Sequence, residues 1–168
     1  MKTQSSRIIY ITQAALIAAI YTVLTMIAAG FDLASGAIQV RFSEALTILP
    51  VFSLSAVPGL TVGCVLANLL TGCAPWDVVF GSLATLIGAV GTRLLRKKPY
   101  VAWIPPVVSN MAIVPIVLMK VYGVEDAWWY LVCTVGVGEI ISCGVLGLLL
   151  YKSLKKIPQL ERTGFIDP

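Results

Sequence analysis

The sequence contains no histidine, and only 12% of its 168 residues are charged. Without histidine, zinc sites, Ser–His dyads and histidine proton relays are all disfavoured. A soluble domain usually carries about 25% charged residues, so the charges here are too few to cover a water-facing surface. Because 58% of the residues are hydrophobic, the composition predicts an integral membrane protein with no soluble domain large enough to fold alone.

Two further absences limit the chemistry. The sequence has no GxxxxGK[ST] segment, which disfavours a nucleotide-hydrolysis site, and nothing in it resembles a catalytic centre. The cysteines form no CxxC pair, and all four are expected to be small packing residues: Cys64, Cys73, Cys133 and Cys143. The chain is therefore predicted not to be an enzyme, with no catalytic residues, no metal site and no cofactor.

Apolar runs that approach membrane-spanning length recur along the whole chain. A spanning helix needs roughly 20 mostly apolar residues, and turn and basic segments divide the chain into six such runs. The second and third runs are short, so they could be two tilted spans or one broken hairpin. The predicted fold is a single all-α domain over residues 1–168, a bundle of six transmembrane helices. The expected spans are 8–30, 43–55, 57–72, 77–95, 101–120 and 127–151.

The basic residues predict how the bundle is oriented. If six spans leave both termini in the cytoplasm, ten Lys and Arg residues lie inside and two, Arg41 and Lys120, lie outside. This distribution satisfies the positive-inside rule. Merging the second and third runs into one span would place the basic segment 93–98 outside, so the charges also favour six spans.

Few polar groups lie within these spans, where charged and carboxamide side chains are costly and usually face a cavity or a partner. At about 1.5 Å per residue, Asn68 lies about one turn below the outer end of the third span. Asn110 and Glu139 lie near the middle of the fifth and sixth spans. We expect these groups to line one outward-opening pocket with the charged residues at the outer ends: Arg41, Glu44 and Asp77.

Each of these groups also has a purely structural interpretation. Asn68 and Asn110 could form hydrogen bonds between helices. Glu139 could belong to a buried ion pair, for which Arg41 is the nearest basic candidate, and Arg41 could instead pair with Glu44. Three tryptophans are expected around the rim of the pocket, although they could equally be interfacial anchors: Trp76, Trp128 and Trp129.

Small residues recur at a spacing of four in two of the spans. The first span contains the pairs Ala14/Ala18 and Ala15/Ala19, and the third contains Gly59-x-x-x-Gly63. This spacing lets helices approach closely. On the first span it indicates either packing inside the bundle or docking to another membrane subunit.

Several short segments are distributed along nearly the whole chain, and their order and spacing are specific. They are QVRFSEALT at 39–47, PGL at 58–60, GCVLAN at 63–68, Asp77, GSLATLIG at 81–88, Asn110 and VGE at 137–139. Together they resemble the QueT family, the substrate-binding (S) components of energy-coupling factor (ECF) transporters. The resemblance implies a six-helix S-component fold that holds its solute near the outer side of a bacterial cell membrane.

The resemblance also implies a solute and partners. The solute would be a queuosine precursor, a 7-deazaguanine such as 7-aminomethyl-7-deazaguanine. The partners would be a transmembrane coupling protein and two ABC-type ATPases, which would supply the energy that this chain has no site to provide. In S components generally, small residues on the first helix dock on the coupling protein, and the matching residues here are Ala14, Ala15, Ala18 and Ala19.

The polar candidates suit the chemistry of such a solute. Glu139 or Glu44 could accept two hydrogen bonds from the N–H/NH₂ edge of a deazaguanine. Asp77 or the second glutamate could hold a cationic aminomethyl group, and the two asparagines offer both donors and acceptors. Aromatic residues could stack on the ring: Phe42, Trp76 and Trp128. The sequence leaves two alternatives open, an S component for another vitamin or nucleobase and a membrane scaffold subunit that binds no solute.

Overall fold

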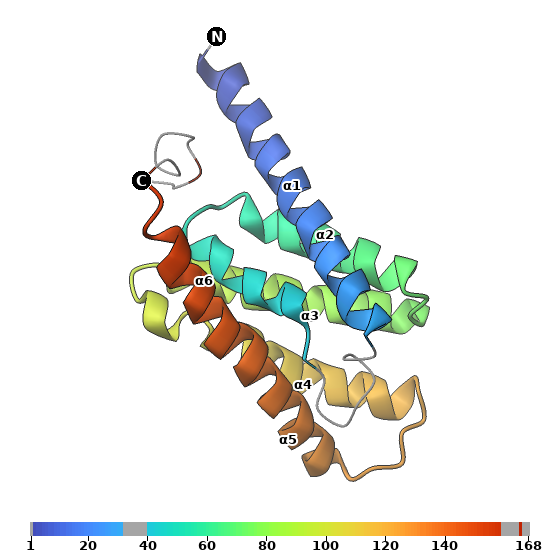
Figure 1. Cartoon of the computed structure of the whole chain (residues 1–168). Coiled ribbons are helices and arrows are strands. Elements are labelled where there is room, and N and C mark those ends of the chain that lie inside the picture. The colour runs from blue at the N-terminus through green and yellow to red at the C-terminus, as the bar shows by residue number, and fades with distance from the viewer. Residues whose placement is uncertain (1, 32–39, 159–164, 166–168) are drawn as a thin grey trace.

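The computed structural model describes residues 2–31, 40–158 and 165, with side chains from Arg7 onward, and in these residues every regular element is helical (Figure 1). Residues 32–39, which include Gln39 of the segment quoted above, lie outside the described residues. In chain order the elements are α1 (Lys2–Gly30), η1 (Phe42–Val51), α2 (Ala56–Leu70), α3 (Pro75–Leu94), η2 (Pro99–Val101), α4 (Ile104–Lys120), α5 (Trp128–Glu139), η3 (Ile140–Leu146) and α6 (Gly147–Leu154).

These elements form six helical segments, because η2 leads into α4, and α5, η3 and α6 run on as one helix. Four segments are long and apolar enough to cross a membrane: Arg7–Gly30, Pro75–Leu94, Pro99–Lys120 and Trp128–Leu154. The other two are the short apolar helices η1 and α2, of 10 and 15 residues. The all-α prediction of six helices in a multi-pass membrane protein is confirmed, whereas the exact membrane boundaries stay a prediction.

Glycine and proline set the helix ends near one end of the bundle. Gly72 follows α2 with a φ of 74°, a left-handed conformation that glycine adopts without strain. The amides of Gly72 and Cys73 donate to the carbonyls of Leu69 and Asn68 at 3.2 and 2.9 Å, which is the hydrogen-bond pattern of a Schellman cap. Pro75 then opens α3, where a missing N–H costs nothing. This tight connection makes α2 and α3 antiparallel neighbours.

Small residues let the first and third helical segments pack closely. A Cβ atom added to Gly59 would lie 2.8 Å from the carbonyl oxygen of Ala14, and one added to Gly63 would lie 3.0 Å from that of Ala18. Without side chains at the two glycines, the backbones of α1 and α2 come into direct contact, as expected of small-residue interfaces in membranes. The internal-packing interpretation is therefore confirmed for Ala14 and Ala18.

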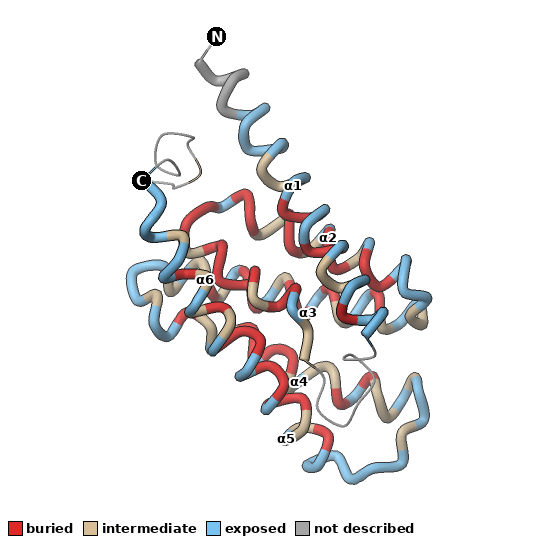
Figure 2. Tube along the Cα trace, in the orientation of Figure 1, coloured by how far each residue is buried: buried red, intermediate tan, exposed pale blue. Residues whose placement is uncertain are grey.

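The buried residues gather where the six segments face one another (Figure 2). One apolar cluster joins α1, η1 and α2 around Tyr21, Leu46 and Leu60. A second cluster joins η1 to α6 around Ile48, Phe52 and Tyr151. The rings of Phe52 and Tyr151 stack with their centroids 5.3 Å apart. The start of α1 and the end of α6 point toward the same end of the bundle (Figure 1), as an even number of crossings requires.

Candidate functional site

Glu44 lies in the first turn of the short 3₁₀ helix η1 and is only 2% exposed. The chain enters this helix in an extended conformation at Arg41, and the amide of Glu44 donates to the Arg41 carbonyl at 3.1 Å. One carboxylate oxygen, Oε1, accepts a hydrogen bond from the phenol of Tyr21 at 2.5 Å. The other oxygen, Oε2, is buried and has no hydrogen-bond partner among the described residues, so within that part of the chain Glu44 presents an unused acceptor inside the bundle.

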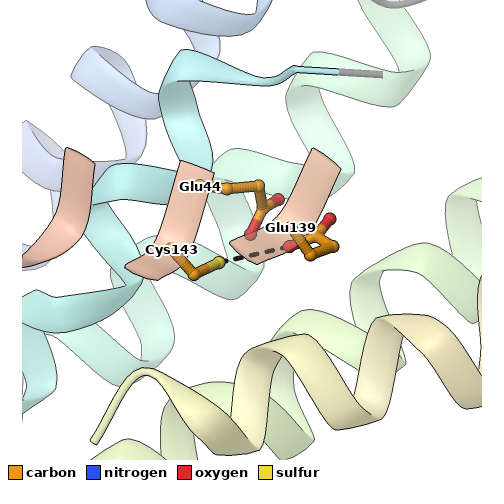
Figure 3. Close-up of side chains that lie close together, drawn as sticks. All are labelled: Glu44, Glu139 and Cys143. Atoms are coloured by element: carbon orange, nitrogen blue, oxygen red, sulfur yellow. Dashed lines mark hydrogen bonds between the residues drawn. The ribbon is translucent and has the colours of Figure 1, made fainter. Parts of the chain in front are cut away.

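Glu139 approaches the same region from the last residue of α5 and is 8% exposed. Its Oε2 atom accepts a hydrogen bond from the thiol of Cys143 at 3.2 Å, and its carboxylate lies near the side chain of Asn110 on α4. Glu44, Glu139 and Cys143 lie close together although they come from two distant parts of the chain (Figure 3). The structure therefore brings two buried carboxylates into one site.

The segment after Glu139 is a π-helix, η3, and it ties the last span to η1. The backbone amide of Arg41 donates to the hydroxyl of Ser142 at 3.2 Å, and the hydroxyl of Thr47 lies 3.4 Å from the sulfur of Cys143. Single π-turns inside α-helices are frequent at functional sites. Here the wide turn holds Ser142 and Cys143 toward η1, which fixes the spacing between Glu44 and Glu139.

A small cavity lies beside these groups, lined by Arg41, Val114, Val135 and Glu139. Its volume is about 10 Å³, which is room for about one water molecule. The guanidinium of Arg41 attracts both Glu44 and Glu139. When all three groups are ionised, two carboxylates face one guanidinium, so the site carries an excess of negative charge.

Among the described residues, one group of side chains could hold a metal ion: Glu44, Glu139 and Cys143. Ligand atoms of Glu44, Glu139 and Cys143 all lie within 4.8 Å of one another. Carboxylates favour hard cations, whereas a thiolate favours soft ones, so this donor set does not select one metal. The shared property is attraction for positive charge, whether of a metal ion or of an ammonium group.

The predicted site residues divide into two groups. Arg41, Glu44, Asn110 and Glu139 come together around the buried carboxylates. Asn68 is buried between α2 and α3, where its amide lies 3.7 Å from the Cys64 sulfur and packs against Gly81. This contact supports the interhelical interpretation for Asn68.

Asp77 and the predicted aromatic residues lie outside the carboxylate cluster. Asp77, in the first turn of α3, accepts a hydrogen bond at 2.9 Å from Tyr122 in the α4–α5 connection. Trp76 is 62% exposed and stacks on Phe80, while Trp128 is 53% exposed. Phe42 and Trp129 are exposed as well.

Three residues of the site were not predicted to take part in it: Tyr21, Thr47 and Cys143. Cys143 was expected only to pack, yet it also donates to Glu139, four residues earlier and one turn away. That spacing was a usable signal, because residues i and i+4 share a helix face. Tyr21 gave a weaker signal, as a polar aromatic residue on the same stripe of the first span as Ala14 and Ala18.

The four alanines proposed for docking lie on two faces of α1. Ala14 and Ala18 face α2, as described above. Ala15 and Ala19 are exposed, in a surface that also includes Leu16 and Val23. Docking thus stays a prediction that concerns the exposed pair.

Comparison with known proteins agrees with this architecture. A relative named "Queuosine precursor transporter QueT", from Lactococcus lactis subsp. cremoris (strain MG1363), is 36% identical over 74 residues, which cover 44% of this chain and 43% of the relative. The match thus spans less than half of that protein. No solved structure matches the chain. The family model described as "QueT transporter" matches residues 11–156, a range that includes α2, α3, α4 and both halves of the carboxylate site, and the chain therefore belongs to the QueT transporter family.

Proposed function

We propose that this chain is the substrate-binding component of an ECF-type importer and that it takes up a queuosine precursor, 7-aminomethyl-7-deazaguanine or a close relative. Membership of the QueT transporter family and the printed name of the Lactococcus relative support this proposal. The multi-pass helical fold is consistent with it. Transport energy would come from separate ATPases through a transmembrane coupling protein.

The observation that carries the proposal is the bare, buried Oε2 atom of Glu44 next to Glu139. An unpaired carboxylate oxygen in the interior is unfavourable, because it has lost water and gained no donor. A deazaguanine supplies N–H and NH₂ donors along one edge, and an aminomethyl group adds a cation. Such a solute would satisfy the free oxygen and reduce the excess negative charge of the site.

Each residue around the carboxylates receives a role in this proposal. Glu44 and Glu139 accept hydrogen bonds from the base edge and the ammonium group. Asn110 offers its amide to the ring carbonyl or a ring nitrogen, and Arg41 balances part of the carboxylate charge. The outer residues Phe42, Asn68, Trp76, Asp77 and Trp128 are assigned no direct contact in the form described here.

We further propose that both termini are cytoplasmic and that the chain lies in the bacterial cell membrane, as the distribution of basic residues predicts. In this orientation the start of η1, with Arg41 and Glu44, faces the outer half of the membrane. The exposed Ala15/Ala19 face of α1 would contact the coupling protein, since small residues permit close helix approach.

The test is a calorimetric titration of the purified chain with a panel of solutes. We expect tight, saturable binding of 7-aminomethyl-7-deazaguanine and weaker binding of guanine, riboflavin, biotin and thiamine. Tight binding of one of the vitamins instead would replace the solute but keep the class of protein. Absence of saturable binding, together with assembly into a membrane complex, would support a scaffold subunit and overturn the proposal.

A further inference from the structure

Tyr21 lies on the inner face of α1 and is 2% exposed, one of the largest fully buried side chains of the bundle. Space for it comes from α2, since a Cβ atom at Gly63 would lie 2.8 Å from the Cβ of Tyr21. Its phenol donates to Glu44 Oε1 at 2.5 Å. The side chain therefore reaches from α1 to a carboxylate of η1 while remaining almost completely buried.

A second side chain of α1 holds the same turn of η1. Thr25, one turn after Tyr21, has its hydroxyl 2.8 Å from the hydroxyl of Ser43, the residue before Glu44. Ser43 and Glu44, two consecutive residues of η1, are thus hydrogen-bonded to two residues on one face of α1. Because 3₁₀ hydrogen bonds have poorer geometry than α-helical ones, these side-chain bonds add needed rigidity to the first turn of η1.

The Tyr21 bond occupies one oxygen of Glu44 and leaves the other free. A carboxylate with both oxygens unpaired could rotate about its terminal torsion, which is broad for such groups. With Oε1 held, the position of Oε2 is fixed before solute arrives. Recognition groups that are held in place in this way bind more tightly, since less conformational freedom is lost on binding.

We propose that Tyr21 is a positioning residue for solute recognition, which acts through Glu44 by directing its free oxygen toward the solute. This inference rests on the proposed function. It assigns to α1 a part in the binding site, in addition to the docking surface proposed for its opposite face. Solute binding and partner docking would then involve two faces of a single helix.

The test compares Tyr21→Phe, which removes only the hydroxyl, with the wild type by titration with 7-aminomethyl-7-deazaguanine. We expect about a tenfold loss of affinity, of the size that one charge-assisted hydrogen bond carries. Thr22→Val is the matched control, because Thr22 is buried on the same helix and its hydroxyl donates to the carbonyls of Ala18 and Gly63 rather than to Glu44. The affinity of Thr22→Val for 7-aminomethyl-7-deazaguanine should stay within about twofold of the wild-type value.

A double-mutant cycle separates positioning from a general effect on folding. If Tyr21 acts through Glu44, adding Tyr21→Phe to Glu44→Gln should change affinity by less than about twofold. Adding it to Glu139→Gln should still cost about tenfold, as it does in the wild type. Equal losses in both backgrounds would overturn the proposal.

Folding is followed separately by the melting temperature of each variant. A lowered melting temperature with unchanged affinity of the folded fraction would show that Tyr21 is only structural. If the wild type binds the solute and Tyr21→Phe binds it equally well, the Tyr21 inference fails while the proposed function stands. If the wild type binds no deazaguanine, the proposed function fails and the Tyr21 inference fails with it.

Discussion

The two ends of η1 have opposite chemistry although both are buried. Its polar half, here residues 43–47, places Ser43, Glu44 and Thr47 in the interior, each no more than 2% exposed, beside Leu46 of the apolar core. Its second half places Ile48 and Leu49 there, and Phe52 follows directly. The polar half faces Tyr21 of α1 and Cys143 of η3, whereas the apolar half packs on Tyr151 of α6.

The last span shows the same division in the same chain direction, with its polar residues before its apolar ones. Glu139 and Cys143 lie level with the polar half of η1, and Tyr151 lies level with its apolar half. Between them, Gly147 lies beside η1, where a Cβ atom would stand at an ordinary contact distance of 3.5 Å from the carbonyl oxygen of Ala45. The proposed recognition groups and the apolar packing residues therefore occupy adjacent halves of one helix pair, so substitutions in the two halves should separate binding from stability.

The largest expected effect is at the apolar half. Ile48→Ala should lower the free energy of unfolding by about 3 kcal/mol, because Ile48 is 1% exposed and its removal leaves a cavity. Affinity for the solute should change by less than about threefold. Reversible unfolding in mixed micelles measures the first quantity and calorimetry the second. Leu54→Ala, at a position 48% exposed, is the control and should change neither; a large loss of affinity in Ile48→Ala would break the division.

At the polar half, Glu44→Gln should weaken solute binding about 100-fold, or about 2.8 kcal/mol. The substitution removes the charge that would attract the solute and replaces one acceptor oxygen by a donor. The melting temperature should fall little, since the shape of the side chain is kept. Glu125→Gln, in the exposed α4–α5 connection, controls for a general change of charge. Wild-type affinity in Glu44→Gln would remove Glu44 from the site.

A smaller loss is expected at the second carboxylate. Glu139→Gln should weaken binding by tenfold or more, about 1.4 kcal/mol. Its Oε2 atom already accepts a hydrogen bond from Cys143, whereas Oε2 of Glu44 has no hydrogen-bond partner among the described residues, so Glu44 is expected to contribute more. A calorimetric titration that gave a greater loss for Glu139→Gln than for Glu44→Gln would reverse the assigned order of the two groups.

The smallest effect is expected at the Asp77–Tyr122 pair, outside the carboxylate cluster. Tyr122→Phe should leave solute affinity within about twofold of the wild type. Burial raises the pKa of the Tyr122 phenol to about 12, so the phenol stays protonated near neutral pH and continues to donate to Asp77. The bond should be lost only as the pH rises through that value. A tenfold loss of affinity in Tyr122→Phe would falsify the exclusion of Asp77 from the site.

Much of this architecture could be predicted from the sequence, because long apolar runs in a chain with few charges allow little besides a helical bundle. Arg41, Glu44, Asn110 and Glu139 were expected to meet, since buried polar groups in membranes gather around cavities or partners. Their pairing with Tyr21 was not expected. A tyrosine in an apolar run fits lipid interfaces and cores equally well, and only the packing of α1 on Gly63 shows which it faces.

The outer residues show a different limit of sequence reasoning. Asp77 and Trp76 were placed near the pocket because they lie at the end of a span, and depth along a helix could be read from residue number. The rotation of each helix about its axis and the course of the connections could not be read from residue number. The contact of Tyr122 with Asp77 depends on the α4–α5 connection, and the course of that connection does not follow from residue number.

The cavity beside Glu139, with room for about one water, has a kinetic consequence. A flat bicyclic base cannot enter a space of that size until the surrounding side chains separate, so each binding event must wait for an opening. Association should then be slower than diffusion alone would allow, and its observed rate should level off as solute concentration rises. The same wall delays escape, so a solute once enclosed should dissociate slowly.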